Sequence, residues 1–427
     1  MTSSGRFLCA ALLAGAIPFT ARAQSDTLRL PELQSLAQRT DPREAELKLL
    51  EMQSRLRLRN MRAERLPSLM VDGYAQYQSD VAQLPVRFPG VSIPTPPHET
   101  YDARLIAQQR LYDPTLAPRR AVERAQTVSD QAKVSASLYT LRKNLTDAYF
   151  TALAAQEQLR EIGAGVTDLE AQLRVVSARV KEGTALPSEE NAVRAELLRR
   201  RQLQEQADAN RVSAMIVVFS LTGRQGDLDN VVLAFPDTTS ALDSLSFRTL
   251  TDMTRRPEIR ALRAAQDVVE AQRNARSAQD RPRISAFGRA GYGRPGLNPL
   301  ATRWDSYWLA GVQLQWSPFT WGTTGRDRQV LELQSRILAQ EEASLALAFQ
   351  REGSRDLAQI SWLVPALRTD DQIIALREKI LAETAARFRE GAVTADVYVD
   401  KQTDVLSARI AKAVHRVGLA RARAGVG

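Results

Sequence analysis

The sequence predicts a mainly α-helical protein with a smaller membrane β-barrel portion, and three observations lead to this fold class. The chain after residue 23 contains two related copies of one sequence pattern. Each copy has two strand-length segments in which apolar and polar residues alternate, followed by a very long helix with a heptad repeat of apolar residues. Membrane-length strands joined to rods too long for a globular domain indicate a conduit rather than a compact enzyme.

The duplication is visible residue by residue. At a constant offset of 215, Pro42, Pro67, Gly73 and Tyr77 return as Pro257, Pro282, Gly288 and Tyr292. Further along the offset becomes 208, and Glu182 and Gly183 return as Glu390 and Gly391. A period of about 200 residues is too long for a solenoid repeat, so we interpret the chain as one protomer built by duplication. The first repeat is expected over 24–226 and the second over 251–427, with a linker at 227–250.

Residues 1–23 have the pattern of a cleaved secretory signal. Arg6 precedes an apolar run over 7–19, and Ala21-Arg22-Ala23 supplies a small-x-small cleavage site, so cleavage is expected after about Ala23. An anchor helix is the alternative, but the run is too short to cross a bilayer and contains Pro18. The only cysteine, Cys9, lies inside this segment and residue 24 is Gln, which predicts no disulfide and no N-terminal lipidation.

Composition argues against a nucleic-acid-binding protein and against an enzyme. The formal charge is +9 with a pI near 9.9, but acidic and basic residues are interspersed along helical patterns, which indicates a solvated helix surface. The two histidines, His98 and His415, stand far apart, and no HExxH, GxSxG or P-loop pattern is present. We therefore expect no catalytic site, no cofactor and no metal site.

Period-two alternation marks four candidate strands, at 67–78, 100–111, 282–293 and 305–317. Each has about ten residues, the length that a tilted strand needs to cross a bilayer. One face carries the residues predicted to face lipid, which are Val71, Leu105, Ala286 and Val312. Aromatic residues near the strand ends predict a membrane girdle of Tyr77, Tyr101, Tyr292, Trp308 and Trp316. A half-buried sheet in a soluble protein would show the same alternation.

Four strands cannot close a barrel, because the smallest membrane barrels have about eight. An open sheet edge in hydrocarbon would leave backbone groups without hydrogen bonds at several kcal/mol each. The hydrogen-bonding requirement alone therefore predicts an obligate homo-oligomer.

The helical rods follow the strands. Helices are expected over 114–182 and 321–390, where apolar residues alternate spacings of three and four, and the first rod is about 100 Å long at 1.5 Å per residue. Gly183 and Gly391 are suited to end these helices, and Ser188 to cap the next one. Return helices are expected over 188–222 and 395–424, and a shorter helix over 257–280 opens the second repeat.

The order of these features resembles the TolC-like outer-membrane efflux protein family. The resemblance rests on Leu28-Arg29-Leu30-Pro31-Glu32, Leu221-Thr222-Gly223, Arg256-Pro257-Glu258 and the paired Glu-Gly tips, and it covers nearly the whole mature chain. It implies a trimer with a twelve-stranded outer-membrane barrel and a helical tunnel through the periplasm of a Gram-negative bacterium. It further implies a passive exit duct of a tripartite efflux pump or type I secretion system, with a periplasmic adaptor and an inner-membrane exporter as partners. The linker would lie in an equatorial belt.

The resemblance also suggests functional residues at the hairpin tips. Related channels place acidic residues shortly after the second tip glycine, where they constrict the closed tunnel, and here Asp396 and Asp400 are the candidates. In the first hairpin Glu189 and Glu190 are candidates, although the family often has an apolar residue where Glu190 stands. In the alternative interpretation, Asp396 and Asp400 are ordinary solvated helix residues. The residues expected to dock the adaptor are Glu182, Gly183, Glu390 and Gly391.

The second functional hypothesis is a periplasmic coiled-coil adaptor. Such a protein would account for the rods, but it would not account for two strand pairs with aromatic ends. The exported substrate and the energy source of the partner pump are not encoded in an identifiable motif.

Overall fold

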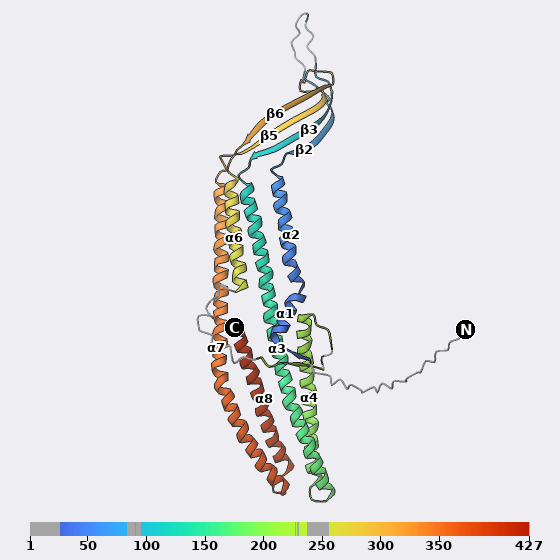
Figure 1. The fold of residues 1–427 in the computed structure, drawn as a ribbon, viewed down its shortest axis with the longest axis vertical. Helices are drawn as coiled ribbons and strands as arrows, with labels where there is room; N and C mark the ends of the chain where they lie inside the picture. The colour runs from blue at the N-terminus through green and yellow to red at the C-terminus, as the bar shows by residue number, and fades with distance from the viewer. Residues whose placement is uncertain are drawn as a thin grey trace, which may run out of the picture. The chain divides into compact units, whose positions relative to one another are not determined.

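The computed structural model describes residues 26–82, 90, 95–226, 228, 230–236 and 256–426 (Figure 1). The predicted signal segment and most of the predicted linker lie outside these residues. The first repeat contains β1 (Asp26–Leu28), α1 (Leu30–Thr40), α2 (Pro42–Ala63), β2 (Ser68–Tyr77), β3 (Glu99–Tyr112), α3 (Leu116–Lys181) and α4 (Pro187–Thr222). Strand β4 (Val231–Leu233) lies in the predicted linker. The second contains α6 (Pro257–Ala278), β5 (Arg283–Arg294), β6 (Asp305–Gln315), α7 (Thr323–Arg389) and α8 (Ala395–Val426). None of the described helices is sufficiently long and apolar to cross a bilayer.

Two compact units make up the chain, and each contains segments of both repeats. One unit comprises Met1–Leu33, Asp147–Asp237 and Leu367–Val417, and is here called the hairpin unit. The other comprises Gln34–Thr146, Thr238–Ala366 and Gly418–Gly427, and is here called the sheet unit. The boundaries between the compact units therefore cut through the long helices α3 and α7 rather than between the repeats.

The sheet unit contains an antiparallel four-stranded sheet in the order β2-β3-β5-β6 (Figure 1). The central pairing, β3 with β5, joins the two repeats over the register Tyr101↔Arg294 to Tyr112↔Ile284. The edges of the sheet are β2 and β6, which connect to α2 and α7 respectively. Each edge strand therefore presents one row of backbone groups that no described strand pairs.

Helices α2 and α6 occupy equivalent places before the first strand of each repeat. Both begin with proline at the first helical position, where the missing N–H is not needed. Asp41 caps α2 by accepting a hydrogen bond from the Arg43 backbone N–H at 2.9 Å. Salt bridges tie α6 to α7, with Arg263 2.8 Å from Glu342 and Arg276 2.8 Å from Asp327.

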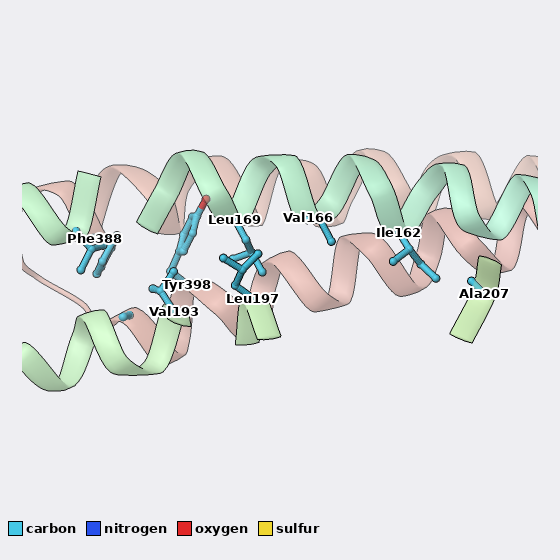
Figure 2. Packing of buried hydrophobic residues seen from close by; sticks show 10 residues of the cluster. Ile162, Val166, Leu169, Val193, Leu197, Ala207, Phe388 and Tyr398 are labelled. Atoms are coloured by element: carbon cyan, nitrogen blue, oxygen red, sulfur yellow. The ribbon is translucent and has the colours of Figure 1, made fainter. Parts of the chain in front are cut away.

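The hairpin unit packs the α3–α4 hairpin against the α7–α8 hairpin around a shared apolar core (Figure 2). Helix α3 contributes Ile162, Val166, Leu169 and Val176, and the other helices contribute Val193, Leu197, Ala207, Phe388, Ala395 and Tyr398. The rings of Phe388 and Tyr398 stack with centroids 5.4 Å apart. The alternating spacing of three and four in the sequence thus corresponds to a buried stripe, because it keeps these side chains on one helix face.

Both long helices end in the same glycine-terminated turn. Gly183 and Gly391 have φ of 71° and 74°, the left-handed conformation that a β-carbon disfavours. The following residues, Thr184 and Ala392, donate backbone hydrogen bonds to the carbonyls of Arg179 and Arg387 at 2.8 and 2.9 Å. This six-to-one bond is the signature of a Schellman motif and satisfies carbonyls that the helix leaves unpaired.

The prediction that Ser188 caps the returning helix is wrong. Helix α4 begins at Pro187 with Leu186 at the capping position, and no side chain accepts a hydrogen bond there. Proline favours the first helical position because its φ is already helical, and this displaces Ser188 into the first turn.

A two-stranded parallel sheet completes the hairpin unit. Strand β1 pairs with β4 in the register Asp26↔Val231 to Leu28↔Leu233. The Tyr149 hydroxyl of α3 bonds the carbonyls of Leu28 and Ala234, and Gln156 donates to the Leu233 carbonyl at 3.1 Å. Burial raises the pKa of Tyr149 above its ordinary value, so the hydroxyl stays a neutral donor at physiological pH.

Candidate functional site: the two faces of the sheet and the hairpin tips

One face of the four-stranded sheet is apolar and exposed. A single cross-strand row on this face runs Val71↔Leu105↔Ala290↔Trp308. Val71 is 81% exposed and Trp308 77% exposed, and Val312 further along β6 is 67% exposed. Side chains of this size and number do not face water across a whole sheet surface in a soluble domain, which indicates an apolar environment on this side.

The opposite face of the sheet carries charges. The next cross-strand row runs Asp72↔Arg104↔Gly291↔Tyr307. Arg104 binds Asp72 through Nη2 at 2.6 Å and Nε at 2.8 Å, and approaches Asp102 at 3.4 Å. The Tyr307 hydroxyl donates to the Asp102 carboxylate, with both oxygens 2.7 Å away. The polar network fits contact with water rather than with lipid.

Aromatic side chains gather at both ends of the strands. Tyr101 and Tyr292, both predicted girdle residues, each stack on Trp304 with ring centroids 5.7 and 5.5 Å apart. Tyr77 stacks on His98 instead, at 6.1 Å. At the other end Trp316 donates through Nε1 to the Asp280 carbonyl at 3.1 Å, while Trp308 lies within β6 rather than at its end.

Three exposed aromatic residues close to the strand ends were not among the predicted girdle residues. These are Trp304 beside β6 and two residues after it, Phe319 and Trp321, which are 85% and 91% exposed. All three stand just outside a strand in the sequence, so extending the aromatic search by a few residues beyond each alternating segment would have found them.

Apolar stripes on α2 and α7 are exposed within the part of the chain that the structure describes. Leu49, Met52 and Leu56 of α2 follow spacings of three and four and are 62%, 58% and 58% exposed. Val330, Leu333 and Ile337 of α7 follow the same spacings and are 61%, 57% and 59% exposed. These two helices are the ones connected to the edge strands β2 and β6, so the exposed stripes continue the open edges of the sheet.

The four predicted gate carboxylates differ in their surroundings. Glu190 lies 2.6 Å from Arg194 and accepts a hydrogen bond from Ser177 at 2.9 Å, so its charge is compensated. Asp396 and Asp400 are exposed in the first turns of α8, and neither contacts a cation within the described part of the chain. Glu189 lies in the first turn of α4, half-buried. The structure therefore leaves uncompensated acidic charge near the tip of the second hairpin.

The predicted docking residues lie together at the two hairpin tips. Glu182 and Glu390 are exposed, and each directly precedes its left-handed glycine. The tips are joined by Arg179 of α3, whose guanidinium donates to the Phe388 carbonyl of α7 at 3.0 Å. Across the described ranges, no group of three or more His, Cys, Asp or Glu side chains is placed to hold a metal ion.

Comparisons with known proteins agree with this architecture. Residues 253–426 match the family model for outer membrane efflux proteins. The structure of the outer-membrane channel OprN is similar with a TM-score of 0.71 at 19% identity, covering 93% of this chain and 88% of that one. The CusC structure has a TM-score of 0.70 at 17% identity, covering 92% and 91%, and the Campylobacter jejuni CmeC outer membrane channel has 0.67 at 14%, covering 93% and 84%.

These matches establish the fold, and a comparison with curated protein sequences finds no significant match. The resemblance to outer-membrane efflux proteins that the motifs predicted is confirmed, as is the predicted fold class of long helices with a smaller β portion.

Proposed function

We propose that this protein is one subunit of a trimeric channel-tunnel. The proposal is supported by the second repeat, which matches outer membrane efflux proteins, and by the fold of outer-membrane channels over 93% of the chain. It serves as the passive exit duct of a tripartite efflux pump or a type I secretion system. A duct needs no catalytic chemistry, so the energy for export comes from an inner-membrane partner.

The observation that carries this proposal is the sheet with two unlike faces and two unpaired edges. The apolar face suits lipid and the charged face suits a water-filled lumen. In a bilayer, β2 and β6 cannot remain unpaired, because each open backbone group costs several kcal/mol in hydrocarbon. Pairing β6 of one copy with β2 of the next satisfies both edges and closes the sheet when the ring is complete.

The exposed stripes of α2 and α7 support the same assembly. They follow the edge strands along the helices, so the neighbour that pairs with β6 also brings its α2 stripe toward the α7 stripe. Spacings of three and four on both helices suit knobs-into-holes packing between copies. The interface is heterologous, since two different surfaces of the chain meet, and such an interface can close into a ring.

The tips supply the proposed contacts with the periplasmic partner. Asp396 and Asp400 of three copies would place six carboxylates around one opening and favour cations over anions in the closed state. Glu182, Gly183, Glu390 and Gly391 form the surface to which an adaptor would dock. Residues 1–23 would be removed on export, without lipidation, and mass spectrometry of the purified protein would detect a mature start at Gln24.

The test compares arginine at two neighbouring positions of β6. Val312→Arg places a charge on the lipid face and should cost about 2 to 4 kcal/mol near the bilayer centre, whereas Gln313→Arg places it on the lumen face. We expect the Val312→Arg variant to lose outer-membrane trimer and the Gln313→Arg variant to retain it. Equal trimer yield from both variants would contradict the assignment of the faces. Recovery of the parent in the soluble periplasmic fraction would favour the adaptor hypothesis.

A further inference from the structure

Two glycines of β5 form a trough across the charged face of the sheet. Gly291 and Gly293 stand at neighbouring positions on that face, between Arg104 and Asp102 of β3 on one side and Tyr307 and Asp305 of β6 on the other. Since neither glycine has a side chain, the surface of β5 is open to its backbone here. The side chain of Tyr307 crosses β5 at this point and contacts Asp102 on β3.

The Tyr307 ring lies in this trough in contact with the backbone of β5. A β-carbon added at Gly291 would stand 2.6 Å from both Cζ and Oη of Tyr307, closer than any real carbon contact. A β-carbon at Gly293 would stand 2.9 Å from Oδ1 of Asp102, the hydrogen-bond acceptor of Tyr307. The ring and its acceptor therefore both occupy space that only glycine leaves free.

The hydroxyl of Tyr307 is fixed at the far side of the trough. Asp102 is only 7% exposed, and Arg104 approaches the same carboxylate while it binds Asp72. A hydrogen bond to a charged and largely buried acceptor is among the stronger side-chain bonds, so it holds the ring against the sheet. Phe287 repeats the arrangement beside Gly311, where a β-carbon would meet Cζ at 2.8 Å.

We propose that Gly291 determines the free width of the lumen at this level of the sheet by keeping the Tyr307 ring flat against the lumen wall. The inference rests on the proposed function, because it takes the charged face as the lumen. With any larger residue at position 291, the only group in contact that can move away is the far end of the Tyr307 side chain, and its free direction is off the sheet. Three such rings, one from each copy, would then narrow the lumen at one level and exclude wider solutes.

The test is the single-channel conductance of purified trimers in planar bilayers, with Gly291→Ala as the main variant. Gly288→Ala is the matched control, because Gly288 lies on the same strand but on the lipid face, and a β-carbon there meets nothing within 4 Å. We expect Gly291→Ala to lower conductance, Gly288→Ala to retain the parental value, and the double variant Gly291→Ala with Tyr307→Ala to restore it. Tyr307→Ala alone should leave conductance near the parental value, because the ring already lies out of the path.

Each departure from this pattern has a defined meaning. Parental conductance in an intact Gly291→Ala trimer would overturn the inference, and so would a large gain in conductance from Tyr307→Ala alone. If Gly291→Ala alone does not assemble, recovery of trimer in the double variant would support displacement of the ring, and failure of the double variant would refute it. Failure of the parent to form any channel would instead contradict the proposed function.

Discussion

The two helical hairpins share a backbone but differ in where they place charge. Glu170 pairs with Arg201 at 2.7 Å between α3 and α4, and at the same offset Glu378 pairs with Arg409 at 2.6 Å between α7 and α8. The neighbouring position differs, because the first hairpin buries Arg200 where the second has Ala408. Duplication has thus kept the turns and a surface ion pair, while buried and tip charges have diverged.

Arg200, present only in the first hairpin, connects three helices through the hydrogen bonds of its buried side chain. It is 1% exposed and donates to Glu196 at 3.0 Å, to the Gly165 carbonyl at 3.2 Å and to the Thr403 hydroxyl at 3.2 Å. One guanidinium therefore ties together α3, α4 and α8. The hairpins are not interchangeable copies, since the connection depends on Arg200 of the first hairpin, and Ala408 at the equivalent position of the second cannot make it.

The largest expected effect comes from removing that connection. Arg200→Ala leaves buried acceptors unpaired and a void in the core, and should lower the free energy of unfolding by about 3 kcal/mol. Arg201→Ala, which removes the exposed ion pair next to it, should cost less than about 1 kcal/mol. Denaturant unfolding followed by circular dichroism measures both, and similar losses from the two variants would contradict the assigned difference in burial.

A smaller effect tests what the hairpins share. Gly183→Ala and Gly391→Ala each force a β-carbon into a left-handed turn, which should cost about 1 kcal/mol per site. Because the two turns have nearly the same φ and equivalent hydrogen bonds, the losses in unfolding free energy should be similar. A loss confined to one glycine would show that the two turns differ in strain.

Lowering the pH should reveal a further difference between the two hairpins in how stability depends on acid. Burial tends to raise the pKa of Glu196, but hydrogen bonds from Arg199 and Arg200 outweigh it and lower that pKa below its ordinary value. A lowered folded-state pKa gives stability that is present above the unfolded-state pKa and lost as pH falls through the folded one. Glu196→Gln should therefore flatten the fall in melting temperature below about pH 4.5. If the melting temperature of Glu196→Gln falls with pH as steeply as that of the parent, Glu196 does not contribute to the loss of stability in acid.

The smallest effect on stability is expected at the second tip. Asp396→Ala with Asp400→Ala removes two exposed carboxylates and should change the unfolding free energy by no more than about 0.5 kcal/mol. If these residues ring the periplasmic opening, the double variant should nevertheless weaken cation preference in planar bilayers. Replacing Glu190, whose charge Arg194 already compensates, should change selectivity less. A larger change in selectivity from replacing Glu190 than from replacing Asp396 and Asp400 would indicate that the gate lies at the first hairpin.

Periodic features of the sequence were predictable and cross-strand contacts were not. Alternation over Ser68–Tyr77 determines which residues share a face, because successive side chains in a strand point to opposite sides. The contact of Tyr307 with Asp102 depends instead on the strand order, which no local pattern contains. Strands β1 and β4 have three residues each, too few to show a period. The roles of the tip carboxylates remain predictions, since exposure alone does not establish a gate.

The pairing of β1 with β4 also constrains when this part of the chain can fold. Asp26 is synthesised early, but its partner Val231 follows about 200 residues later, so closing this contact carries the entropy cost of a long loop. Until β4 is available, Tyr149 lacks its Ala234 acceptor, and its Leu28 acceptor is not yet held in the β1–β4 pair. The small sheet therefore cannot form before Val231 is present, and a chain that stops before Val231 cannot complete the contacts around Tyr149.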